Sequence, residues 1–129
     1  MIRLARNEDG KRLEELASKQ VGKGLDWSNV YPYWLVAEKE GKIIGCLSVA
    51  LGKPVGRLDI LALDDSLSPH SRSRAVRGLI LQGMATLKAD GSTACLSVVP
   101  FKLKAYKRIL KKHFDVEVAG QGNMIIKRL

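Results

Sequence analysis

The segment Ser68-Pro69-His70-Ser71-Arg72-Ser73-Arg74-Ala75-Val76-Arg77-Gly78-Leu79-Ile80-Leu81 joins an apolar strand pattern to the start of a helix, and arginines are concentrated at that junction. The first backbone N–H groups of a helix lack intrahelical partners and carry partial positive charge, so they favour phosphate binding. Arg72, Arg74 and Arg77 add full charges, and the forked donors of arginine suit pairs of phosphate oxygens. The segment therefore predicts a site for a pyrophosphate-bearing ligand. The alternative is a solvated basic face on an ordinary helix.

The length and composition are those of one globular domain. The chain has 129 residues, enough for one hydrophobic core, and we expect a single domain over residues 1–129. Its 46% hydrophobic and 27% charged residues are typical of a soluble protein. No apolar run approaches the roughly 20 residues that span a bilayer, and the segment Met1–Arg6 lacks the long apolar core of a secretory signal. We therefore expect a cytoplasmic protein.

The chain is basic. It contains 22 Lys and Arg residues against 13 Asp and Glu residues, which gives a formal net charge of +9. This excess favours anionic partners, among them nucleic acid, an acidic protein surface or a polyphosphate cofactor.

Cys46 and Cys95 each lie within an apolar strand pattern, so we expect buried, reduced thiols. His70 and His113 are far apart without ligand-spaced carboxylates or cysteines, and we expect no metal site.

The spacing of apolar residues predicts a mixed α/β chain. The predicted strands cover residues 2–4, 34–37, 43–51, 57–63, 93–99, 114–119 and 123–129, and the predicted helices cover residues 8–20, 72–89 and 102–112. We also expect one short helix before the strand that begins at Trp34. Gly41 supplies the positive φ that a tight turn between residues 37 and 43 requires, which predicts a hairpin there.

Aromatic residues are concentrated in the segment from Leu25 to Trp34. They are Trp27, Tyr31, Tyr33 and Trp34, in a chain with only 5% aromatic residues. One interpretation is that they form the wall of a substrate site. The other is that the rings cover an open edge of the hydrophobic core.

The order of elements and the residues of the central junction resemble the GNAT superfamily of N-acetyltransferases over essentially the whole chain. In that family a strand leads through Pro-x-x-Arg/Gln-Gly-x-Gly-x-Gly/Ala into a helix whose N-terminus holds the pyrophosphate of acetyl-CoA. Here Pro69 and Arg72 match, Ser73 and Ala75 replace the first two glycines, and Arg77 stands where a third small residue is expected. The resemblance implies a mixed, mostly antiparallel sheet of six to seven strands flanked by about four helices.

The resemblance also implies which residues bind acetyl-CoA. They are Leu67, Arg72, Ser73, Arg74, Ala75, Val76 and Arg77. Serine and alanine still allow backbone N–H groups to approach a phosphate closely. For Arg77 two outcomes are open: its side chain turns outward and adds a phosphate contact, or it fills the groove and blocks the cofactor.

A second family signature, Asn-x-x-Ala-x-x-Leu/Phe-Tyr-x-Lys-x-Gly-Phe, is matched in part by residues 102–114. The positions that fit are Ala105, Lys111 and Phe114. Lys102 replaces the Asn, His113 replaces the Gly, and Ile109 lies where many members carry a tyrosine general acid. Tyr106, three residues earlier on the same helix, is a candidate proton donor, but the direction of the helix favours the alternative that it is a core aromatic.

Acetyl transfer also needs a group that takes the proton of the attacking amine. Asp59, Asp64 and Asp65 are candidates, and each has an alternative role as a solvated carboxylate at a strand end. Asp64, Asp65 and Ser66 interrupt the apolar pattern before Leu67, which predicts a bulge or irregular strand end. The resemblance implies that backbone groups of this irregular stretch align the pantetheine arm of the cofactor.

Three functions follow from these observations. The first is an acetyl-CoA-dependent N-acetyltransferase that acts on a primary amine of a small molecule or protein. The second is a catalytically inactive GNAT-fold binding or structural protein, of the kind found in bacteriophage genomes, since the motif glycines and the tyrosine are replaced. The third is a nucleic-acid-binding module that uses the basic helix 102–112. Pairing into a homodimer is possible in each case.

Overall fold

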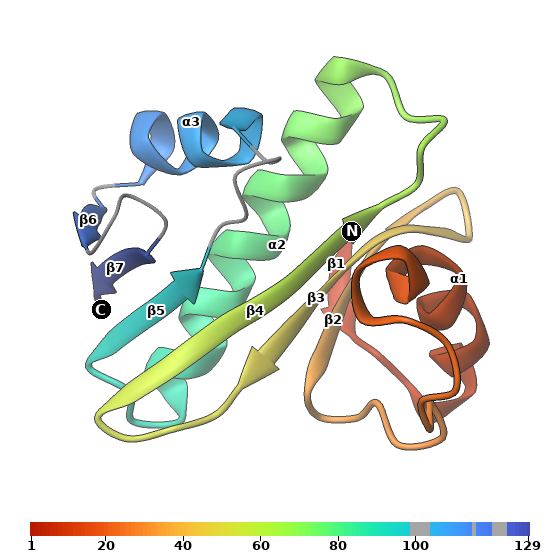
Figure 1. Ribbon diagram of the computed structural model, residues 1–129, viewed down its shortest axis with the longest axis horizontal. Helices are drawn as coiled ribbons and strands as arrows, with labels where there is room; N and C mark the ends of the chain where they lie inside the picture. The colour runs from red at the N-terminus through yellow and green to blue at the C-terminus, as the bar shows by residue number, and fades with distance from the viewer. Residues whose placement is uncertain (99–103, 115, 120–123) are drawn as a thin grey trace.

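The computed structural model describes residues 1–98, 104–114, 116–119 and 124–129. Its described elements are β1 (Ile2–Leu4), the 3-10 helix η1 (Asn7–Asp9), α1 (Gly10–Val21), β2 (Trp34–Lys39), β3 (Lys42–Ala50), β4 (Val55–Leu63), α2 (Pro69–Ala89), β5 (Ala94–Val98), α3 (Lys104–His113), β6 (Glu117–Ala119) and β7 (Met124–Arg128). These strands form one seven-stranded sheet in the order β1-β2-β3-β4-β5-β7-β6 (Figure 1). The pair β4 and β5 is parallel, and the other described pairs are antiparallel.

The predicted fold class is confirmed, with two corrections to the helices. In the described residues there are three α-helices, one fewer than the expected count of about four, because residues 22–33 form turns and irregular backbone where a short helix was predicted. Helix α2 begins at Pro69 and not at Arg72. Proline is well suited to the first turn of a helix because its missing N–H is not needed there. The start of α3 predicted at Lys102, and the glycines 120 and 122, lie outside the described residues.

The hairpin of β2 and β3 forms as predicted. Glu40 and Gly41 both have positive φ, 53° and 77°, as a two-residue turn between antiparallel strands requires. One irregularity follows the turn: Ala37 pairs with Gly45 and Glu38 pairs with Ile43. Ile44 is therefore an extra residue, and this β-bulge changes the direction of the strand beside it.

The sheet separates two apolar cores. Leu13 and Ala17 of α1 pack with Val36, Cys46 and Ala62 on one face. On the other face α2 covers the strands, and the residues that it buries are Ala75, Val76, Leu79, Ile80, Gly83 and Leu87. Alternation of side chains along β2, β3 and β4 supplies both cores from the same strands. No helix of the described residues is both long and apolar enough to cross a membrane.

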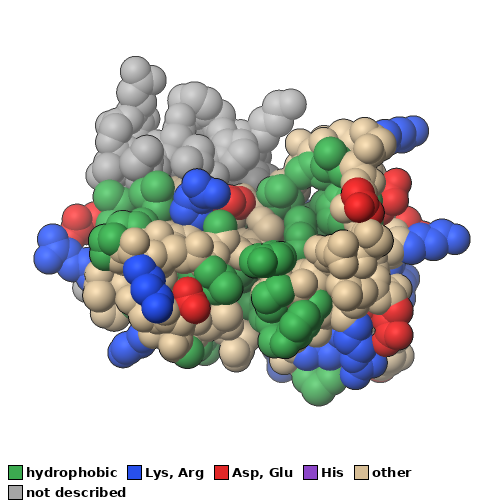
Figure 2. Space-filling view, turned by 90° about the horizontal axis from the view of Figure 1, so that it is seen from below, with side chains coloured by type: hydrophobic (Ala, Val, Ile, Leu, Met, Phe, Trp, Pro, Cys, Tyr) green, Lys and Arg blue, Asp and Glu red, His purple; other side chains and the backbone are tan. Residues whose placement is uncertain are grey.

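The aromatic segment lies at the end of the sheet opposite to the start of α2 (Figure 1). Trp27 and Trp34 pack together with ring centroids 5.4 Å apart, and both contact the core beneath α1. The tryptophans thus cover the edge of this core. Figure 2 views the same end and shows apolar side chains gathered on it. The exposed apolar residues of its loops are Leu25, Tyr31, Tyr33 and Leu51, and Val55 at the start of β4 is also exposed.

Candidate active site

The central strands β4 and β5 separate soon after they begin. Their parallel pairing joins Val55 with Ala94, Gly56 with Cys95, and Arg57 with Leu96. Beyond this point residues 58–63 of β4 still pair with β3, but their other edge, which faces β5, has no strand partner among the described residues. Strand β5 continues beside β7. Figure 1 shows the two strands diverging toward the end of the sheet where α2 begins. The opening leaves backbone N–H and C=O groups of β4 able to bind a ligand.

A β-bulge lies at the point where the strands separate. Leu47 of β3 pairs with Leu61, but Val49 pairs with Leu58, so β4 carries one extra residue opposite Ser48. The hydroxyl of Ser48 accepts a hydrogen bond from the N–H of Ile60 at 2.7 Å and thereby satisfies a donor that the bulge displaces. The irregular stretch that the sequence predicted at residues 64–67 is therefore preceded by a second irregularity inside β4.

Asp59 is located at this bulge. Strand alternation places it on the face of the sheet that α1 covers, opposite to Leu58, which packs beneath α2. Its side chain is 41% exposed, and its nearest cation is Arg57, with Nε at 3.5 Å from the carboxylate. Asp59 is thus an accessible carboxylate at the vertex of the opening between β4 and β5.

The start of α2 follows the end of β4 through a short loop. Ser68 is the N-cap, and its hydroxyl accepts a hydrogen bond from the N–H of Ser71 at 3.2 Å. Pro69 has no N–H, and the N–H of His70 has no hydrogen-bond partner in the described part of the chain. The guanidinium of Arg72 is exposed and donates to the carbonyl of Asp65 at 3.2 Å. The first turn of α2 therefore presents one free N–H and one arginine to solvent.

The predicted cofactor-binding residues lie on different sides of α2. Arg72 belongs to the first turn, and Leu67 lies half-buried in the loop before it. Ala75 and Val76 are buried in the core, and the N–H groups of this second turn are used within the helix. Ser73 is half-buried in the same turn. Leu67 and Arg72 both lie at the start of the helix, and their role in binding the cofactor, like that of the other predicted residues, stays a prediction.

Arg74 and Arg77 both line the cleft of α2 that lies beside α3, and Arg74 also borders a pocket on the side of β1. Arg74 is exposed and lines a pocket together with Ile2 of β1. Arg77 lies beside α3, in an open cleft of about 380 Å³ that His113 and Phe114 also line. Its Nε is buried without a hydrogen-bond partner among the described residues. Arg77 comes nine residues after the N-cap, about 13 Å along the axis, so its backbone position is distant from the first turn.

The carboxylates of Asp64 and Asp65 are each held by cations of α1. Asp64 accepts hydrogen bonds from the hydroxyl and N–H of Ser66 and from Arg12, whose Nη2 lies 2.7 Å away. These bonds hold the pKa of Asp64 well below its usual range. Asp65 pairs with Lys19 at 2.7 Å, and this contact also lowers its pKa. Their predicted role as catalytic bases stays a prediction, and both carboxylates are weak proton acceptors in this arrangement.

Arg12 is a structural residue that the sequence reasoning did not single out. Besides Asp64, its Nε and Nη2 donate to the carbonyl of Ile43 at 3.1 and 3.0 Å. It thereby connects α1 with the bulged part of β3 and with the loop that leads to α2. Its partners lie 31 and 52 residues away, so no local pattern could have indicated this role.

Helix α3 carries the second predicted signature. Tyr106 lies in this helix, and its side chain lies outside what the structure describes. Ile109, at the position of the family tyrosine, packs against the core beneath α2, next to the buried Leu110. The exposed Lys and Arg residues in the described part of the helix are Arg108, Lys111 and Lys112.

Both thiols are buried and free, as predicted: burial raises the pKa of Cys46 to about 12 and that of Cys95 to about 11.

Comparisons with known proteins find similarity at the level of structure. No protein-family model matches the sequence, and no curated protein matches it at a significant level. Ard1 from Thermoplasma volcanium aligns over 100% of this chain and 97% of its own, with 11% identity and a TM-score of 0.78. The ribosomal-protein-alanine N-acetyltransferase from Brucella melitensis aligns over 100% and 99%, with 16% identity and a TM-score of 0.76.

A third solved structure is the putative acetyltransferase yncA from Salmonella typhimurium, determined with its cofactor acetyl-CoA. It aligns over 100% of this chain and 93% of its own, with 14% identity and a TM-score of 0.77. At such identities the similarity establishes the fold. The predicted resemblance is confirmed at that level: the chain has the fold of the GNAT acetyltransferases.

Proposed function

We propose that this protein is an acetyl-CoA-dependent N-acetyltransferase that acts on a primary amine of a small molecule or protein. The observation that carries the proposal is the separation of β4 from β5 directly beside the start of α2. The acetyl-CoA-bound yncA, which shares the fold, supports the choice of cofactor. The ribosomal-protein-alanine N-acetyltransferase supports an amine as the acceptor.

The residues at the helix start fit the phosphates of such a cofactor. The free N–H of His70 and the guanidinium of Arg72 are the donors that would hold the pyrophosphate. The N–H of Ser71 becomes a further donor when its long bond to Ser68 is exchanged for a phosphate oxygen. The unpaired edge of β4 supplies backbone groups for an extended pantetheine arm.

When bound, acetyl-CoA supplies the acetyl group as an activated thioester. In our proposal Asp59 accepts the proton that the attacking amine loses, since its carboxylate is accessible at the vertex of the opening. Asp64 and Asp65 are less suitable because α1 holds both of them. Backbone N–H groups of β4 would steady the negative charge on the carbonyl oxygen. A C–N bond forms, the C–S bond breaks, and Tyr106 on α3 stays the candidate that protonates the leaving thiolate.

One observation favours the catalytically inactive alternative. The hydroxyl of Ser68 occupies the N–H of Ser71, so the N–H of His70 is the one free backbone donor in the described first turn of α2. Ile109 in the core offers no proton donor at the family position. This alternative predicts cofactor binding without turnover, or no binding.

The experiment that separates these functions measures release of CoA from acetyl-CoA in the presence of amines. The acceptor panel contains peptides with N-terminal alanine, free amino acids and diamines. Arg72→Gln is expected to raise the KM for acetyl-CoA about 10- to 100-fold, because it removes one charge-assisted contact of about 1.5–3 kcal/mol. Asp59→Asn is expected to lower kcat with little change in that KM. Lys88→Gln, at the other end of α2, is the matched control and should behave as the native protein.

Three results would count against the proposal. Absence of CoA release with every acceptor, although acetyl-CoA binds, would favour the inactive binding protein. If acetyl-CoA does not bind, the start of α2 is not a cofactor site. Equal KM values for Arg72→Gln and Lys88→Gln would show that the first turn of α2 does not hold the phosphates.

A further inference from the structure

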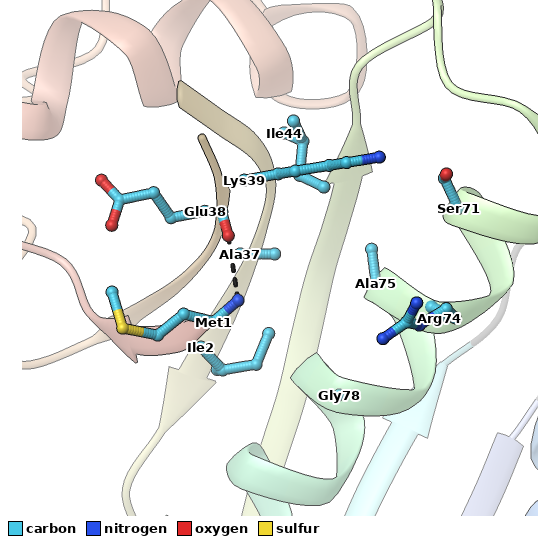
Figure 3. A pocket seen from close by; sticks show the side chains of 10 residues that line it. All are labelled: Met1, Ile2, Ala37, Glu38, Lys39, Ile44, Ser71, Arg74, Ala75 and Gly78. Carbon is cyan, nitrogen blue, oxygen red and sulfur yellow. Dashed lines mark hydrogen bonds between the residues drawn. The ribbon is translucent and has the colours of Figure 1, made fainter. Parts of the chain in front are cut away.

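We propose a second ligand site on the flank of α2 that faces β1, which binds a small carboxylate carrying a short apolar chain. The site is a pocket of about 270 Å³ between α2 and the ends of β1, β2 and β3 (Figure 3). It is slightly smaller than the range of about 300–1,000 Å³ that is typical of drug-sized ligands, so its occupant must be small. The proposal does not depend on acetyl transfer.

The floor of the pocket is apolar and comes from four different elements. Its members are Ile2, Ala37, Ile44 and Ala75. Ile44 is the extra residue of the bulge in β3, and it is only partly buried against the core beneath α2. Gly78 forms one wall: a Cβ there would lie 3.1 Å from Cγ1 of Ile2, so the missing side chain keeps this wall close to β1. An aliphatic chain of a few carbons would gain apolar contacts on this floor.

The charges around the pocket are positive. Lys39 reaches from β2 toward α2, and the guanidinium of Arg74 turns back toward β1 (Figure 3). Neither side chain forms an ion pair within the described residues. The carboxylate among the lining residues is that of Glu38, which points away from α2 toward Arg3, at 3.5 Å. Two uncompensated cations above an apolar floor are complementary to an anionic head group with an apolar tail.

This pocket lies on the other side of α2 from the opening between β4 and β5, although it shares Ser71 with the candidate acetyl-CoA site and includes Arg74 and Ala75, which were also predicted to bind the cofactor. Ser71, Arg74 and Gly78 follow one another at spacings of three and four residues and so share the flank of α2 that faces β1. Arg77 and Leu81 line the cleft beside α3, and Arg74 and Gly78 line this cleft as well as the pocket. The opening between β4 and β5 lies toward β5, whereas the lining strands of the pocket are β1, β2 and β3. A ligand of the pocket therefore contacts α2 from the opposite side.

The test uses hexanoate as the probe and methyl NMR signals as the readout. Hexanoate should shift the signals of Ile2, Ile44 and Ala75 saturably. Hexan-1-ol has the same tail without charge and hexan-1-amine carries the opposite charge, so both should bind at least fivefold more weakly. Lys39→Gln and Arg74→Gln should each weaken hexanoate binding about fivefold, as expected for one partly exposed charge contact.

Lys88→Gln is the control variant, because it removes one positive charge from the same helix at its far end. It should bind hexanoate like the native protein, and melting curves should show that all variants fold. Equal binding of hexanoate and hexan-1-ol would overturn the proposal, since the cations would then play no part. Equal weakening by Lys88→Gln would also overturn it, because net charge alone would explain the binding. Absence of any saturable shift with hexanoate would do the same.

Discussion

Replacing Gly10 with alanine tests how the loop before β2 is attached to α1. Gly10 is the first residue of α1 and has helical backbone angles, φ −53° and ψ −40°. By helix propensity alone, alanine would stabilise this position by about 0.5–1 kcal/mol. A Cβ at Gly10 would, however, lie 2.0 Å from the carbonyl oxygen of Trp27, whereas ordinary Cβ contacts begin near 3.4 Å. The backbone of the loop would have to move by more than 1 Å.

The steric cost decides the sign of this change. Overpacking of this kind costs about 1–3 kcal/mol, and here the obstacle is backbone and not the end of a flexible side chain. Because the obstacle is backbone, we take the upper part of this range, about 2–3 kcal/mol. After subtraction of the propensity gain, we expect Gly10→Ala to lower the free energy of unfolding by about 1–2.5 kcal/mol. For a chain of this length that corresponds to a fall in Tm of about 4–9 °C.

The assay is thermal unfolding followed by circular dichroism, with tryptophan fluorescence as a second probe of Trp27. Gly78→Ala is the matched control, because its Cβ would meet only the side chain of Ile2, at 3.1 and 3.2 Å. Ile2 lies in the short edge strand β1 and can shift by a few tenths of an ångström. Gly78→Ala should therefore leave Tm unchanged or raise it. A Tm for Gly10→Ala at or above the native value would refute the reasoning.

Further predictions concern the ion pairs, the thiols and the core. The lowered pKa of Asp64 means that its ionised form stabilises the fold above the ordinary carboxyl pKa of about 4 and that this stabilisation is lost as the pH falls below it. Urea unfolding from pH 7 to pH 3 should therefore show a shallower loss of stability for Asp64→Asn than for the native protein; parallel curves would contradict this. The raised pKa values of Cys46 and Cys95, about 12 and 11, together with their burial, predict that a disulfide reagent at pH 8 labels them only after unfolding in guanidinium, and rapid labelling of the folded protein would disprove it. Leu79 of α2 is fully buried in the core between this helix and the sheet, so Leu79→Ala should lower the free energy of unfolding by about 2–5 kcal/mol in urea titrations, and a loss below 1 kcal/mol would show a loosely packed core.

Much of the fold could be predicted because its signals are local. Gly41 marks the hairpin, and the apolar spacing from Ala75 to Leu87 marks the buried face of α2. The predicted start of α2, at Arg72, lies about one turn after the observed start at Pro69. The prediction relied on the arginines, whereas Ser68 is the N-cap and Pro69 is the first helical residue. A short helix was predicted before Trp34 from the expected order of elements. The segment is irregular instead, and Trp27 and Trp34 pack against the core beneath α1.

The candidate site was harder to predict because it depends on distant contacts. The bulge beside Asp59 arises from a mismatch in register between β3 and β4, which neither strand shows alone. The sequence around Asp64 does not show whether its carboxylate is solvated, catalytic or structural. The structure shows that it pairs with Arg12, 52 residues away, and that this contact holds the loop before α2. Arg77 was expected either to contact phosphate or to block the groove, and its place beside α3 follows from the packing of two helices.

The most direct test of the central claim is calorimetric titration of the native protein and of Arg72→Gln with CoA. If the start of α2 holds the cofactor, the native protein should bind CoA saturably at 1:1, Arg72→Gln should bind it about 10- to 100-fold more weakly, and Lys88→Gln should bind it like the native protein. The absence of binding by the native protein, or equal affinity of Arg72→Gln, would contradict the claim that the start of α2 beside the opening between β4 and β5 holds the cofactor.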